Sequence, residues 1–98
     1  MEDARIKAQE DAREWTRIMG GNVYRHFKGG LYRVHGVAVH SETAELLVIY
    51  SNQDDQRDEP PRLWARPLAM FLSPVDKTKY PRARQKRRFE KVKVKQNE

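Results

Sequence analysis

Residues 23–40 read Val-Tyr-Arg-His-Phe-Lys-Gly-Gly-Leu-Tyr-Arg-Val-His-Gly-Val-Ala-Val-His, and this stretch decides the fold of the chain. Its first six side chains alternate between two sides, a period of two that is typical of a β-strand. Gly29-Gly30 suits a primed turn, and β-branched and aromatic residues resume from Leu31 to His40. The stretch therefore predicts an antiparallel hairpin, in which Gly36 predicts a bulge or bend of the second strand.

Further strand patterns follow this hairpin. An apolar run inside residues 45–51 predicts a buried third strand, and residues 63–67 follow a polar, acidic loop as a fourth. Residues 68–72 predict one packed helical turn. Residues 82–95 carry a weak apolar trace that fits a last strand, a helix or disorder, and the sequence leaves this choice open. We assign four side chains to the core: Phe27, Val48, Ile49 and Phe71.

An amphipathic helix is predicted before the hairpin. From Glu2 to Met19 apolar residues recur at steps of three and four, and Gly20-Gly21 then supplies a helix stop. Most of the apolar positions are alanines. We therefore expect the larger side chains of Trp15, Ile18 and Met19 to dock the helix onto the rest of the protein.

Composition and length point to one small domain. The chain has 98 residues, of which 38% are hydrophobic, and no cysteine, so neither a disulfide nor a thiolate metal site can stabilise it. No secretory leader pattern and no run of 18 apolar residues is present, and we expect a cytoplasmic monomer without membrane attachment. The predicted fold is mainly β, a small SH3-like antiparallel β-barrel or roll (22–76) with an N-terminal α-helix (1–21) and a basic C-terminal extension (77–98).

Charge is distributed unevenly along the chain. Residues 1–76 carry ten basic and twelve acidic side chains, whereas residues 77–98 carry ten basic and two acidic ones. Clustered Lys and Arg release counterions when they contact phosphates, so this asymmetry favours RNA or DNA as a partner. The candidate nucleic-acid-binding residues are Arg82, Arg84, Lys86, Arg87 and Arg88. A basic terminus that serves only solubility is the alternative interpretation.

Several separated blocks resemble one known family. They are Tyr24-x-His26-Phe27-Lys28-Gly29, Tyr32-x-Val34, His40-Ser41-Glu42-Thr43, Val48-x-Tyr50, and Leu63-Trp64-x-Arg66-Pro67-x-x-Met70-Phe71. Together, over residues 22–75, they resemble the bacterial domain-of-unknown-function family 1653, DUF1653. The resemblance implies a small SH3-like β-roll and no established activity. The family also closes with a Pro-Arg-Phe type element, whereas this chain has Pro81-Arg82 and places its phenylalanine at Phe89.

The same blocks supply the candidate pocket residues. His26 and His40 can transfer protons, ligate a metal or hydrogen-bond structural groups, but no metal-binding spacing accompanies them, and we expect no metal, cofactor or catalytic residue. Arg66 can grip an anionic ligand or pair internally with Glu42. Aromatic side chains can line a groove or fill the core. The full set is Tyr24, His26, His40, Glu42, Tyr50, Trp64 and Arg66.

These features predict a non-enzymatic binding module. In the first hypothesis the basic C-terminal segment attracts the phosphates of RNA or DNA, and an exposed aromatic ring stacks on a base. In the second, the candidate pocket residues converge to bind a small anionic ligand or a modified nucleoside. In the third, the helix face around Trp15 binds a protein partner.

Overall fold

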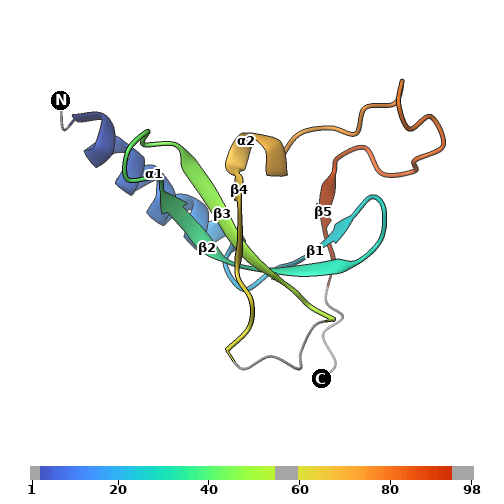
Figure 1. The fold of residues 1–98 in the computed structure, drawn as a ribbon, viewed down its shortest axis with the longest axis horizontal. Helices are drawn as coiled ribbons and strands as arrows, with labels where there is room; N and C mark the ends of the chain where they lie inside the picture. Colours follow the sequence, from blue (N-terminus) through green and yellow to red (C-terminus); the bar gives the residue numbers. More distant parts are fainter. Residues whose placement is uncertain (1–2, 55–59, 94–98) are drawn as a thin grey trace.

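The computed structural model describes residues 3–54 and 60–93, and within these ranges the chain forms two helices and a five-stranded antiparallel sheet (Figure 1). The strand order is β4-β3-β2-β1-β5, and the outer strands β4 and β5 do not pair with each other there. The mainly β fold is thus confirmed as an open roll and not a closed barrel. The elements are α1 (Asp3–Met19), β1 (Val23–His26), β2 (Leu31–Val39), β3 (Leu46–Asn52), β4 (Trp64–Pro67), α2 (Leu68–Phe71) and β5 (Phe89–Lys91).

The β1–β2 hairpin forms where the alternating pattern predicts it. Tyr24 lies opposite Tyr32 in the antiparallel register. The first strand ends at His26, two residues earlier than its alternation suggests, because the chain already turns there: the His26 N–H donates to the Gly30 carbonyl at 3.1 Å. Gly29 and Gly30 have φ values of 108° and 91°, in the region that favours glycine. The glycine pair is therefore required by the turn.

The bulge predicted at Gly36 is confirmed. Val34 pairs with Tyr50 and Gly36 with Ile49, so the register skips one residue of β2. Helix α1 packs on this irregularity: Thr16 Oγ1 accepts the Val37 N–H at 2.8 Å, and a Cβ at Gly36 would lie 3.4 Å from the Thr16 side chain. Gly36 thus lies at the bend, directly against the helix.

Helix α1 covers β2 with the face that contains Ala8, Ala12 and Met19, all of which are buried. Trp15 is half-buried against the same core, as predicted, but Ile18 is 54% exposed, so its predicted docking role is wrong. The buried positions follow one another at steps of three and four, so they lie on one side of the helix. Ile18 does not fit this spacing and faces solvent. Gly21, with φ 82°, ends the helix as expected.

The core is completed by a side chain from the basic segment. Phe89 of β5 stacks on Phe71 of α2, with ring centroids 4.1 Å apart and planes 7° from parallel. Val48 and Phe71 are fully buried as predicted, whereas Phe27 and Ile49 are only half-buried. Among the alternatives that the sequence left open, residues 89–91 form a strand, paired with β1.

Backbone contacts bind the loop between α2 and β5 to the roll. The Val75 N–H donates to the Lys86 carbonyl at 2.8 Å, and the Arg88 N–H donates to the Ser73 carbonyl at 2.9 Å. Figure 1 shows this loop leaving α2 and returning as β5 beside β1. The described part of the predicted C-terminal extension, residues 77–93, is therefore integrated with the sheet; residues 94–98 and 55–59 lie outside the described ranges.

Removal of one ring of the Phe71–Phe89 stack should destabilise the protein. Phe89 is only 4% exposed, so Phe89→Ala should lower the free energy of unfolding by about 3–5 kcal/mol, through lost burial and the cavity left behind. Urea denaturation measures this change. The neighbouring exposed variant Lys91→Ala is the control and should change it by less than about 0.5 kcal/mol. Similar losses for the two variants would contradict this description of the core.

Candidate functional site

Two of the predicted groove aromatics belong to the core. Tyr24 and Tyr50 are 8% and 7% exposed, and their ring centroids lie 5.3 Å and 5.9 Å from that of Phe71. Burial raises the pKa of the Tyr24 hydroxyl. Trp64, in contrast, is 55% exposed on the outer strand β4. The three rings therefore do not form one exposed groove.

His26 and Arg66 meet at the edge of this aromatic core. The Arg66 guanidinium lies 5.5 Å from the centre of the Phe89 ring, and its Nε donates to the Tyr50 hydroxyl at 3.3 Å. The His26 ring lies 4.8 Å from the same phenylalanine. Burial, followed by the positive charges of Arg66, Lys28 and Arg88, lowers the pKa of His26. The arrangement favours a neutral imidazole.

His40 and Glu42 lie elsewhere, in the turn between β2 and β3. His40 Nδ1 accepts the N–H groups of Glu42 and Thr43 at 3.1 Å and 3.2 Å, so the imidazole caps the turn. This turn follows the pair formed by Val39 and Leu46. Leu46 lies four residues from Tyr50 along β3, which corresponds to about 13 Å at the rise of a strand. Glu42 is exposed and forms no ion pair with Arg66. The first and third sequence blocks thus meet, and the second does not join them.

A polar pair that the sequence analysis did not single out joins β2 and β3. His35 Nε2 and Ser51 Oγ are 2.8 Å apart, and Ser51 is buried. Only the strand register, in which Ser51 lies opposite Arg33, brings these residues together. A buried hydroxyl needs a hydrogen-bonding partner, and His35 supplies it. The pair is best explained as a structural contact.

The predicted basic residues lie on a segment whose backbone is bonded to the roll, here called the basic face and comprising residues 77–93. It contains nine Lys or Arg residues and one acidic residue, Glu90. Glu90 Oε2 accepts the backbone N–H groups of Lys86 and Arg87 at 3.0 Å and 3.3 Å, and Arg87 Nη1 donates to the Leu72 carbonyl at 2.8 Å. Arg87 therefore has a structural contact in addition to its charge.

The remaining predicted basic residues differ in exposure. Arg82, Arg84 and Lys86 are exposed, and their side chains form no hydrogen bond or ion pair with residues 3–54 or 60–93. Arg88 is half-buried and contributes its charge beside His26. Three guanidinium or ammonium groups are thus available on the basic face to contact an external anion.

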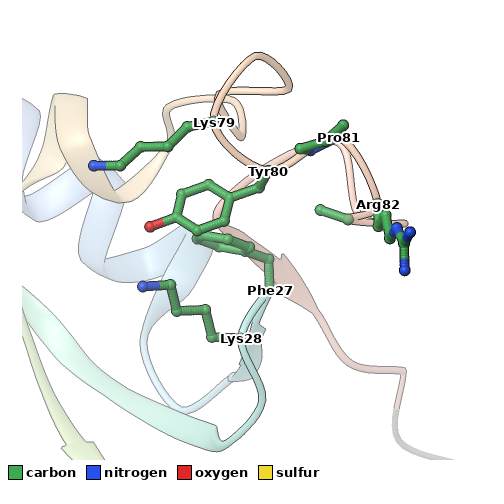
Figure 2. A pocket seen from close by; sticks show the side chains of 7 residues that line it. Phe27, Lys28, Lys79, Tyr80, Pro81 and Arg82 are labelled. Atoms are coloured by element: carbon green, nitrogen blue, oxygen red, sulfur yellow. The ribbon is translucent and has the colours of Figure 1, made fainter.

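A groove opens between the turn after β1 and the loop of the basic face (Figure 2). The volume of this Phe27–Tyr80 groove is about 460 Å³, and its lining consists of Phe27, Lys28, Lys79, Tyr80, Pro81, Arg82 and Ala83. The Lys28 ammonium lies 4.9 Å from the centre of the Tyr80 ring. Its hydrogen bond with the Tyr80 hydroxyl, followed by its positive charge, lowers the pKa of that hydroxyl.

No pattern in the sequence predicts this groove. Tyr80 stands between Lys79 and Pro81 without a strand or helix pattern around it, and its partner Phe27 lies more than 50 residues away. The one available signal was an aromatic residue inside a basic run, a combination typical of nucleic-acid-binding surfaces.

Within residues 3–54 and 60–93, no three His, Asp or Glu side chains gather in a way that could hold a metal ion. No helix in the same ranges has the length and apolar character needed to cross a membrane.

Comparisons with known proteins give one match. A family model described as "Protein of unknown function (DUF1653)" matches residues 22–91. The match confirms the resemblance and extends it from residue 75 through β5, so that the phenylalanine displaced to position 89 lies inside the family region. No curated protein and no solved structure matches the chain.

The environment of His26 predicts a pH dependence. Since folding lowers its pKa, the unfolded chain binds more protons near and below the ordinary value of 6.5, and stability should fall as the pH decreases through that value. An NMR titration of the His26 ring should give a midpoint below 6.5 in the wild type and a higher one in Arg66→Gln, which removes a nearby positive charge. A wild-type midpoint at or above 6.5 would contradict this assignment.

Proposed function

Since the chain belongs to the DUF1653 family, described only as proteins of unknown function, we propose from its geometry that it is a non-enzymatic module that binds nucleic acid on the basic face. RNA and DNA share the phosphate chemistry on which the proposal rests. The observation that supports it most directly is that this folded segment contains nine basic side chains and one carboxylate. That carboxylate, Glu90, already accepts hydrogen bonds from two backbone N–H groups.

The fixed position of the basic face supports this proposal over a merely solubilising tail. β5 pairs with β1, and the preceding loop is bonded to residues 73 and 75. Positive groups held in place lose less conformational freedom on binding than groups on a flexible chain. Exposed Arg82, Arg84 and Lys86 can then contact successive phosphates and release their counterions.

The two other hypotheses receive less support. A small-ligand pocket would need the three sequence blocks around one cavity, but Tyr24 and Tyr50 fill the core and His40 caps a distant turn. A protein-binding helix face would need Trp15, Ile18 and Met19 accessible together, but Met19 is 1% exposed and Trp15 is half-buried, so that only Ile18 is exposed. The charge of residues 77–93 has no role in either hypothesis.

The contacts of His26 and His40 also favour a binding module over an enzyme. Nδ1 of His26 accepts the Lys28 N–H at 3.1 Å, and Nδ1 of His40 accepts two backbone N–H groups. Each imidazole therefore stabilises a turn through one of its ring nitrogens. Among residues 3–54 and 60–93, no carboxylate forms an ion pair with either ring that would orient it as a general base.

Nucleic-acid binding can be tested with two charge-matched double variants. Arg84→Gln/Lys86→Gln alters the basic face, and Arg5→Gln/Arg13→Gln removes the same charge from the exposed surface of α1. Fluorescence anisotropy with a labelled single strand of about 12 nucleotides, over about 50 to 200 mM salt, measures affinity and its salt dependence.

The basic-face variant should bind more weakly, and the slope of log affinity against log salt should decrease in magnitude by about 0.7 for each lost phosphate contact. The α1 variant should keep the wild-type slope. No binding by the wild type, or equal effects of the two double variants, would refute nucleic-acid binding through the basic face.

A further inference from the structure

The Phe27–Tyr80 groove brings two aromatic rings together at the surface. Their centroids are 4.9 Å apart, with the planes at 67°, and both side chains are half-buried. Part of each ring therefore packs against the other, and part remains open to solvent. Figure 2 shows Tyr80 lying over Phe27 at the side of the groove. Such a surface offers a π-face to a flat ligand.

Both walls of the groove are held by the backbone. The Phe27 N–H donates to the Arg88 carbonyl at 2.9 Å, and the Tyr80 N–H donates to the Asp76 carbonyl at 2.8 Å. Asp76 Oδ1 also accepts the Thr78 N–H at 3.0 Å, which fixes the turn that precedes Tyr80. The rings are thus in position before any ligand arrives, which lowers the entropic cost of binding.

Positive groups surround the exposed ring. The ammonium groups of Lys28 and Lys79 lie 4.9 Å and 5.9 Å from the Tyr80 centroid, and Figure 2 shows them on either side of its hydroxyl. Arg82 extends from the opposite end of the groove. A hydrogen bond with Lys28, followed by the charges of Lys28, Lys79 and Arg88, lowers the pKa of the Tyr80 hydroxyl.

This combination selects the chemistry of the ligand. The groove has a volume of about 460 Å³, within the usual range for small-molecule sites, and Pro81 and Ala83 add apolar surface. An aromatic platform flanked by cations suits a flat ring joined to an anion, which is the chemistry of a nucleotide unit. Stacking tolerates every base, since each has a π-face.

We propose that the Phe27–Tyr80 groove holds an unpaired base of single-stranded nucleic acid, stacked on Tyr80, with an adjoining phosphate near Lys28 and Lys79. This inference rests on the proposed function and adds its ligand class. Residues 79–83 line the groove and belong to the basic face, so a strand can run from the groove along the rest of that face. In a duplex the bases are paired and stacked inside, and only the basic face is engaged.

Three probes separate stacking from charge: a labelled oligothymidylate, an abasic strand of the same length and charge, and a duplex. They are compared by anisotropy for the wild type, Tyr80→Ala, Tyr80→Phe and Trp64→Ala. The last removes an exposed ring on β4, outside the groove. Tyr80→Ala should weaken oligothymidylate binding at least about fivefold, the loss typical of one stacked base. Tyr80→Phe and Trp64→Ala should bind oligothymidylate with the affinity of the wild type. For the abasic strand and the duplex, all three variants should have the affinity of the wild type.

A second measurement uses the unaltered protein. Stacking of a base should shift the ring-proton NMR signals of Tyr80 and Phe27 during titration with oligothymidylate, and the abasic strand should not. Salt-dependent binding of all three probes, with Tyr80→Ala equal to the wild type and no ring-proton shift, would overturn the stacking site while leaving the basic face in place. Absence of binding to every probe would overturn both proposals.

Discussion

The stack between Phe71 and Phe89 is the contact on which the rest of the structure depends. It joins α2, which directly follows the outer strand β4, to β5, the outer strand at the opposite edge of the sheet. Tyr24 and Tyr50 pack against the Phe71 ring, and the Arg66 guanidinium lies over the Phe89 ring. A buried aromatic pair of this kind contributes about 0.5–1.5 kcal/mol beyond its burial. In a chain of 98 residues, which can form only a small core, one such pair carries much of the stability.

The same contact determines where the charge of the protein lies. Because Phe89 is inserted into the core, the basic residues before it must follow the outside of the roll. Backbone bonds from residues 73, 75 and 27 to this segment then hold it in place. Glu90 and Asp76, two acidic residues next to the basic run, accept backbone N–H groups. The segment therefore carries its positive charge on a backbone that is bonded to the roll.

Local patterns predicted much of the fold correctly. Alternation located the hairpin, Gly36 marked the bulge, and the glycine pairs located a turn and a helix end, because each depends on residues close in the sequence. The site was predicted less completely. The sequence blocks predicted that His26 and Arg66 lie close together. Only the strand register showed that His40 lies apart from them.

The sequence by itself determined the class of fold, the family and the concentration of positive charge near the C-terminus, since these depend on composition, periodicity and motif. Only the tertiary structure decided that Phe89 enters the core, that Ile18 faces solvent, and that Tyr80 lies against Phe27. The physical reason is the same in each case. Which side of an element is buried, and which distant side chain it meets, depends on the packing of the whole chain, and no local pattern contains that information.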